Sequence, residues 1–138
     1  MRSQHLLTIE SLETGEIEKI LMLATRLKEK PILAENVLRG KAIGLFFEKP
    51  STRTWVSFDV GISSMGGKIV YLGPESIQLG VREPIKDIAR VLARYLDGAV
   101  LRTFKHETVE EFATYFKKPV INGLTDKAHP AQALADFL

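Results

Sequence analysis

Residues 42–54 read AIGLFFEKPSTRT, a short apolar run followed by a polar segment with one proline and three hydroxyl side chains. A continuous apolar run of this length is typical of a strand that is buried on both faces of a parallel sheet. Ser51 is suited to cap a following helix, because its side-chain oxygen can accept a hydrogen bond from the first turn. The stretch therefore predicts a buried strand that leads directly into a helix.

The same order of strand and helix recurs along the rest of the chain. Further candidate strands are residues 69–72, 99–101 and 119–121. Apolar residues spaced three or four apart predict four helices. The four sets are Ile17, Ile20, Leu21, Ala24 and Leu27; Phe58, Ile62 and Met65; Ile85, Ile88, Ala89 and Leu92; and Val109, Phe112, Ala113 and Phe116. A last helix is expected to start at Pro130. Alternating strands and helices indicate a parallel sheet with right-handed crossovers. We therefore expect a three-layer α/β domain with a parallel, mainly four-stranded sheet flanked by helices.

The composition fits one domain, to which we assign residues 1–138. The hydrophobic fraction of 45% and the charged fraction of 26% are typical of a globular domain that buries one core. The chain has no cysteine, which excludes disulfides and is compatible with the cytoplasm. The net charge of +2 comes without a basic run, and no apolar stretch is long enough to span a bilayer. Neither nucleic acid nor a membrane is an expected partner.

The segments that follow the predicted strands should meet at one edge of the sheet, because a parallel sheet places the carboxyl ends of its strands side by side. Residues 51–54 follow the first strand and residues 73–78 the second, while Arg102 closes the third and residues 122–132 follow the fourth. They bring arginines, hydroxyl groups, amides and an imidazole together with little acid. This edge is expected to bind an anion.

Each candidate also has a simpler structural interpretation when it is taken alone. A helix start with two threonine hydroxyls and the guanidinium of Arg53 can hold a phosphate, but residues 51–54 also fit an ordinary capped helix. Arg102 also fits a surface residue at a strand end. His129 and Gln132 can point into one cleft, where an imidazole donates to a carbonyl oxygen and an amide accepts from an NH2 group. A histidine satisfied by its local backbone is equally expected.

Other kinds of site find no support in the sequence. Residues 61–68 resemble a phosphate-binding loop, but Gly67 stands where its lysine should be, and no glycine-rich dinucleotide fingerprint follows a strand. Three scattered histidines make no metal site. His5 is expected to belong to a mobile terminus, and His106 is expected to be a surface residue near a helix start.

Several motifs resemble those of the aspartate and ornithine carbamoyltransferases. The family motifs are the Ser-Thr-Arg-Thr segment within residues 46–54, followed by Ser57-Phe58, and the His-Pro-x-Gln segment at residues 129–132. Residues 120–126, Glu48-Lys49 and residues 78–80 are similar to the ornithine branch. The resemblance covers essentially the whole chain, in order and at consistent spacing.

The resemblance implies the carbamoyl-phosphate-binding half of a carbamoyltransferase, most like ornithine carbamoyltransferase. The reaction would transfer a carbamoyl group from carbamoyl phosphate to the δ-amine of ornithine, giving citrulline and phosphate, in arginine biosynthesis or a step of the urea-cycle type. It would need neither a metal nor an organic cofactor. The resemblance also implies a cytoplasmic homotrimer. The family's second domain, which binds the amino acid, is absent from this chain, so the chain alone is expected to be inactive.

The resemblance further implies a role for each site residue. The phosphate would be held by Ser51, Thr52, Arg53 and Thr54. Arg102 would bridge the phosphate and the carbonyl oxygen, and Thr54, Arg102 and His129 would polarise that carbonyl as the catalytic residues. Gln132 would orient the carbamoyl NH2 group, and Gln78 would reach into the site of a neighbouring subunit.

Two residues depart from the family pattern, and two other interpretations stay open. Trp55 stands where the family usually has a second arginine, and we expect it to pack on the helix face. Ala131 replaces the cysteine that is usual in the ornithine branch.

One alternative is the matching half of an aspartate or polyamine carbamoyltransferase, and the other is a non-catalytic module that binds anions or forms trimers.

Overall fold

A computed structural model describes residues 3–138, and a sheet of four parallel strands forms its centre. In the spatial order β2-β1-β3-β4, the strands are β2 (Lys68–Leu72), β1 (Ala42–Phe47), β3 (Gly98–Arg102) and β4 (Val120–Asn122). In β1, Ile43 lies level with Ile69 on one side and with Gly98 on the other. Each predicted strand is confirmed to within one residue at either end.

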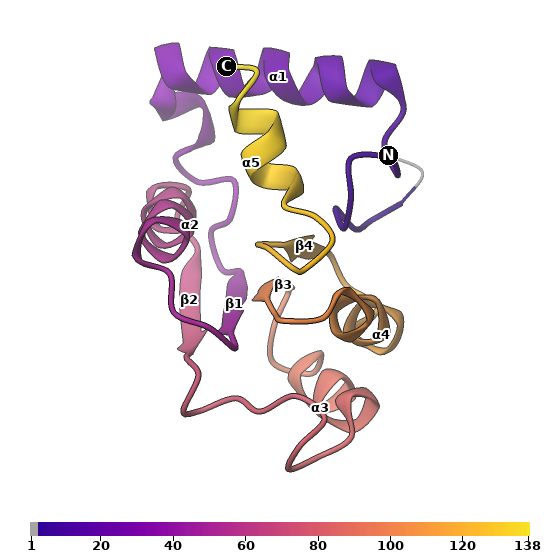
Figure 1. Ribbon diagram of the computed structural model, residues 1–138. Helices are drawn as coiled ribbons and strands as arrows, with labels where there is room; N and C mark the ends of the chain where they lie inside the picture. Colours follow the sequence, from indigo (N-terminus) through magenta and orange to yellow (C-terminus); the bar gives the residue numbers. More distant parts are fainter. Residues whose placement is uncertain (1–2) are drawn as a thin grey trace.

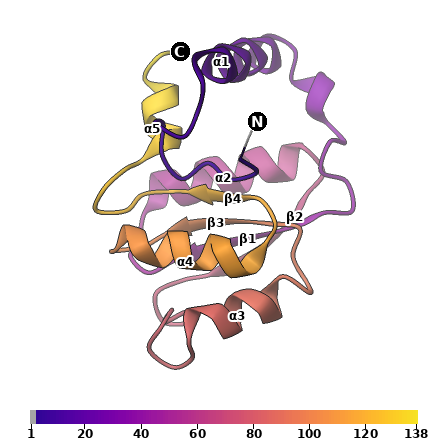
Figure 2. The ribbon, with the colours of Figure 1, turned by 90° about the vertical axis from the view of Figure 1, so that its right-hand side faces the viewer.

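Helices cover both faces of this sheet (Figure 1). The helical elements are α1 (Thr14–Glu29), the 3-10 turn η1 (Pro31–Ala34), α2 (Thr52–Ser64), α3 (Ile85–Leu92), α4 (His106–Phe116) and α5 (Pro130–Ala135). Helix α2 lies on one face, α3 and α4 lie on the other, and α1 lies outside these layers (Figures 1 and 2). The predicted three-layer α/β fold is confirmed.

Two apolar clusters join the layers. On one face, Phe47 and Val100 pack with Ile62 of α2. On the other face, Phe46 and Leu101 join a larger cluster that includes α4 residues. Successive strand residues point to opposite faces of a sheet, so the neighbours Phe46 and Phe47 serve different clusters. Burial on both faces is the reason why β1 is apolar throughout.

The N-terminal segment extends the sheet beyond β4, so the expectation that His5 belongs to a mobile terminus is wrong. The N–H group of Leu6 donates to the carbonyl oxygen of Val120 at 2.8 Å, and the N–H group of Val120 donates to Nδ1 of His5 at 3.2 Å. Burial lowers the pKa of His5. The open edge of β4 presents backbone groups that need partners, and this segment supplies them.

No helix within residues 3–138 is both long enough and apolar enough to cross a membrane.

Candidate functional site

The carboxyl ends of β1, β3 and β4 bring three of the predicted segments together. Strands β1 and β3 end level, with Phe47 opposite Arg102, and the N–H group of Glu48 donates to the carbonyl oxygen of Arg102 at 2.8 Å. Strand β4 ends at Asn122, and the loop that follows leads to His129 at the start of α5. Side chains from α2, β3 and α5 are therefore anchored at one edge, where ligands of open α/β sheets bind.

Ser51 places the start of α2 at this edge. Its Oγ accepts a hydrogen bond from the N–H group of Thr54 at 3.3 Å, which confirms the predicted helix cap. Thr52 and Arg53 follow in the first turn with exposed side chains. The first N–H groups of a helix lack partners within it and lie at the positive end of its dipole. The start of α2 is therefore suited to a phosphate group.

A pocket of about 390 Å³ opens between α2 and α5, and its size is typical of a small-molecule site. Its lining consists of Arg53, Thr54, Ser57, Phe58, His129, Ala131, Gln132 and Ala135. Four residues predicted from the sequence, two from each helix segment, thus line one cavity. Ser51 and Thr52 lie beside it at the start of α2 and outside its lining.

Arg102 joins α2 to the loop after β4. Its Nη1 donates to Oγ1 of Thr54 at 3.3 Å and to the carbonyl oxygen of Gly123 at 3.5 Å. Within residues 3–138, its buried Nε has no hydrogen-bond partner. Burial lowers the pKa of the guanidinium, although it stays charged at neutral pH. A partly buried cation with an unused donor is suited to bind an anion.

His129 occupies the N-cap position of α5, at the border of the pocket. Burial lowers its pKa, the positive charge of Arg102 lowers it further, and Asp136 opposes both effects. The imidazole is therefore neutral at pH 7. Its Nδ1 is buried and finds no hydrogen-bond partner in the described part of the chain. Nearby, Nε2 of Gln132 donates to Oδ1 of Asp136 at 2.9 Å.

Gln78 does not join these residues. It lies exposed in the loop after β2 and lines a separate pocket of about 480 Å³, together with Glu48, Phe104 and Lys105. Its expected reach into a neighbouring subunit's site stays a prediction.

Trp55 packs as expected. Its ring stacks on Tyr71 with the centroids 4.3 Å apart, and Tyr71 in turn meets Phe47 edge to face at 5.8 Å. The stack links the surface of α2 to the buried end of β1, while 39% of Trp55 remains exposed. An uncharged aromatic side chain thus occupies the first turn of α2, two residues beyond Arg53.

The interpretation of His106 as a surface residue is wrong. The residue is only 5% exposed, and its Nδ1 lies 2.8 Å from Oγ1 of Thr125. A signal for this burial was present in the sequence, because His106 lies three residues before Val109 and seven before Ala113. The helical period therefore places it on the same inward face.

Known proteins resemble the chain over almost its whole length. Residues 4–138 match the family described as aspartate/ornithine carbamoyltransferase, carbamoyl-P binding domain. The ornithine carbamoyltransferases of Methanopyrus kandleri and Anoxybacillus flavithermus are each 49% identical to the chain, of which they cover 99% and 100%; in both cases the match spans 45% of the relative. The solved ornithine carbamoyltransferase from Pyrococcus furiosus superposes with a TM-score of 0.93 at 43% identity, over 96% of this chain and 43% of that one.

A second solved structure, the anabolic ornithine carbamoyltransferase from Campylobacter jejuni, gives a TM-score of 0.92 at 39% identity, over 98% of this chain and 44% of that one. The chain spans somewhat less than half the length of the relatives it matches. Sequence and fold lead to the same assignment, and the chain belongs to the aspartate/ornithine carbamoyltransferase family.

Proposed function

We propose that this chain is the carbamoyl-phosphate-binding half of an ornithine carbamoyltransferase. The observation that carries the proposal is the meeting of Arg53, Thr54, His129 and Gln132 around one pocket, with Arg102 bonded to Thr54 beside them. Buried Nε of Arg102 and buried Nδ1 of His129 have no partner among residues 3–138. Unsatisfied buried donors and acceptors are costly, and a bound polar ligand removes that cost.

In this proposal the phosphate group binds at the start of α2. Ser51 and Thr52 lie at the beginning of the helix, and the exposed guanidinium of Arg53 folds over the anion. Guanidinium groups bind phosphate through two parallel hydrogen bonds. Backbone N–H groups and the helix dipole add to the attraction.

The carbamoyl carbonyl then lies against Thr54, Arg102 and His129. Attack by the δ-amine of ornithine places negative charge on the carbonyl oxygen, and the leaving phosphate gains charge as its bond to carbon breaks. Donors that are already fixed in place stabilise these charges more strongly in the transition state than in the ground state. The 3.3 Å contact between Arg102 and Thr54 holds two of the donors together, and Gln132 orients the carbamoyl NH2 group.

The relatives favour ornithine as the acceptor. Those described above are named ornithine carbamoyltransferases, which supports ornithine over aspartate or a polyamine and a transferase over a non-catalytic module. We further propose that the reaction serves arginine biosynthesis or a step of the urea-cycle type in the cytoplasm. We also propose a homotrimer in which Gln78, which does not line the pocket between α2 and α5 of its own chain, serves a neighbouring subunit.

A chimeric enzyme tests this function. The chain replaces the matching 43% of the Pyrococcus furiosus enzyme, and citrulline formation is measured with ornithine or aspartate as the acceptor. We expect citrulline from ornithine, no product from aspartate, and loss of activity in Arg102→Met. A chimera that melts cooperatively and binds the carbamoyl-phosphate mimic phosphonoacetamide, yet forms no citrulline, would overturn the proposal.

A further inference from the structure

Among residues 3–138, the proposed mechanism leaves one buried ionisable side chain without a role, His106 at the first position of α4. Its Nε2 lies 3.5 Å from Oε1 of Glu110 and makes no hydrogen bond within residues 3–138. Its Nδ1 lies 2.8 Å from Oγ1 of Thr125. Burying an imidazole costs free energy unless its polar atoms are bonded, so the contact with Thr125 is the one that holds the ring in place.

Thr125 organises the loop that leads from β4 to His129. Its Oγ1 accepts hydrogen bonds from the N–H groups of Lys127 and Ala128, each at 3.2 Å. Its own N–H group donates to the carbonyl oxygen of Ala128 at 3.0 Å. These bonds close a tight turn that ends directly before His129. The hydroxyl of Thr125 therefore helps to hold the turn that leads into His129 and α5.

Counting the bonds of this hydroxyl assigns the tautomer of His106. A hydroxyl oxygen has two lone pairs and one hydrogen. The N–H groups of Lys127 and Ala128 use the lone pairs. The hydrogen then goes to Nδ1 of His106 at 2.8 Å, which is closer than the alternative acceptor, the carbonyl oxygen of Ala128 at 3.4 Å. Nδ1 of His106 is thus the acceptor in this contact, and Nε2, on the side of Glu110, carries the proton of the ring.

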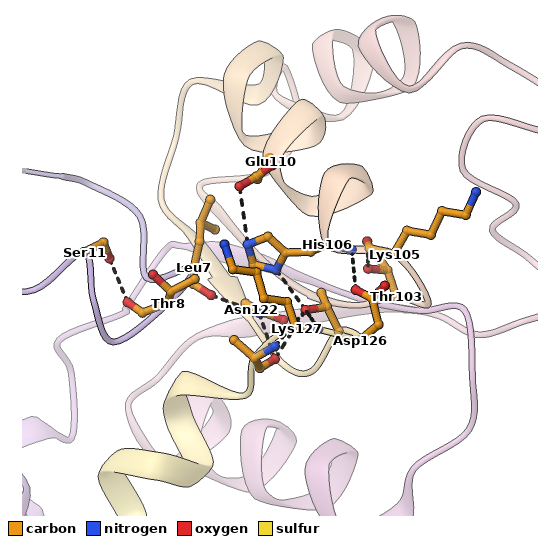
Figure 3. Close-up of polar contacts among 12 residues, drawn as sticks. Leu7, Thr8, Ser11, Thr103, Lys105, His106, Glu110, Asn122, Asp126 and Lys127 are labelled. Carbon is orange, nitrogen blue, oxygen red and sulfur yellow. Dashed lines mark hydrogen bonds and ion pairs between the residues drawn. The ribbon is translucent and has the colours of Figure 1, made fainter.

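Further bonds tie the same loop to the connection between β3 and α4. Oδ1 of Asp126 accepts from the backbone N–H group of His106 at 3.0 Å and so satisfies the first turn of α4 (Figure 3). The N–H group of Asp126 donates to the carbonyl oxygen of Phe104 at 3.1 Å, and Thr103 donates to Leu124 at 3.0 Å. Because this connection begins at Arg102, the two segments that carry Arg102 and His129 are joined to each other.

We propose that His106 is a positioning residue for the pocket, accepting a hydrogen bond from Thr125 and thereby holding the loop that presents His129 towards Arg102. The identity of the ligand in this inference depends on the proposed function, whereas the arrangement of the loop follows from the observed contacts alone. The residue touches neither the ligand nor the reacting atoms, so its effect passes through His129 and Gln132.

Three variants separate positioning from general stability. His106→Leu removes the acceptor, whereas His106→Asn keeps one close to the position of Nδ1. Val109→Ala weakens the same helix at a fully buried apolar residue and leaves the loop contacts intact. We expect affinity for phosphonoacetamide, measured by titration calorimetry, to fall about tenfold or more in His106→Leu, because a buried hydrogen bond is lost and the hydroxyl hydrogen of Thr125 keeps only the longer contact with the carbonyl oxygen of Ala128. Affinity stays near that of the unmodified chain in the other two variants.

A second measurement does not depend on the ligand. In His106→Leu, residues 125–128 are no longer held in place, and His129 becomes more exposed. We therefore expect the pKa of His129, followed by NMR titration, to rise. We also expect amide hydrogen exchange at Lys127 and Ala128 to become faster relative to exchange in α4. If the unmodified chain does not bind phosphonoacetamide, that result contradicts the proposed function. The NMR comparison then still decides whether His106 positions the loop. An unchanged His129 titration with unchanged exchange overturns the positioning role. If His106→Leu does not fold, His106→Ala against His106→Asn tests the same bond, with the same loss expected in the alanine variant only.

Discussion

At the scale of single residues, His129 lines the pocket and Arg102 lies close enough for its charge to act on the imidazole. Both side chains would be positively charged if the imidazole took up a proton. Burial lowers the pKa of His129 below its ordinary value of 6.5, and the neighbouring guanidinium lowers it further. The chain therefore keeps one fixed cation and one neutral imidazole side by side. That combination attracts an anion while leaving a ring that can donate a hydrogen bond to a carbonyl oxygen.

The lowered pKa of His129 predicts a loss of stability in mild acid. The unfolded chain takes up the proton more readily than the folded chain, so the stabilising contribution is present above pH 6.5 and is lost as the pH falls through the folded pKa. His5 contributes with the same sign, because burial lowers its pKa too. Urea unfolding between about pH 7.5 and pH 5 measures the effect. We expect a shallower pH dependence in His129→Gln, and an identical dependence in both proteins would show that His129 is not its source.

The guanidinium of Arg53 is expected to supply much of the affinity for the phosphate group of the ligand. Arg53→Ala removes charge-assisted hydrogen bonds of roughly 1.5–3 kcal/mol each, so affinity for phosphonoacetamide should fall at least about tenfold. Arg94→Ala is the matched control, since it removes an exposed arginine that does not line the pocket. Equal affinity in the two variants would remove Arg53 from the site.

Residues with local partners could be predicted from the sequence, whereas residues with distant partners could not. The capping role of Ser51 depends on Thr54, only three positions away. His5 depends on Val120, 115 positions away, and His106 depends on Thr125, 19 positions away. The prediction for His5 is wrong because nothing in its immediate neighbours shows which distant segment will bury it. For His106 the helical spacing indicated the inward face, but nothing nearby indicated its partner Thr125.

At the scale of elements, the start of α2 serves both as a helix terminus and as the proposed anion site. Ser51→Ala removes the side-chain acceptor of the cap and should cost about 0.5–2 kcal/mol of stability. Ser51→Asp keeps a capping oxygen and adds a negative charge that suits the helix dipole but repels a phosphate.

We therefore expect Ser51→Asp to unfold at a urea concentration at or above that of the unmodified chain and to bind phosphonoacetamide more weakly. Ser51→Ala should lose stability. Full binding by the aspartate variant would show that the ligand does not approach the start of α2.

The elements themselves could be predicted because each one is a local pattern. The apolar run of β1 and the three-to-four spacing in α4 each indicate their structure without reference to the rest of the chain. The order β2-β1-β3-β4 could not be predicted, because it depends on which strands pair across long crossovers. The place of Gln78 was also beyond prediction, since it lies in an irregular loop whose path no periodic pattern describes.

On the scale of the whole molecule, much apolar surface remains uncovered. Helix α1 contains no buried residue, and Val56 and Val60 on α2 are at least half exposed. Exposed apolar side chains that gather on a surface often mark contacts with other surfaces. The chain also spans less than half the length of its relatives. The proposed trimer is one assembly that would cover part of this surface.

Sedimentation equilibrium tests the trimer. We expect a mass three times the 15.4 kDa of the chain at high concentration, with dissociation on dilution. A single species of monomeric mass at every concentration would contradict the assembly while leaving the pocket within one chain unaffected.

The central claim is that the pocket between α2 and α5 binds carbamoyl phosphate. Titration calorimetry of the chain with phosphonoacetamide, with inorganic phosphate as the comparison, tests it most directly. The account predicts saturable binding of phosphonoacetamide that is tighter than that of phosphate and is lost in Arg102→Met. Binding no tighter than that of phosphate, or binding that survives the loss of Arg102, would contradict it.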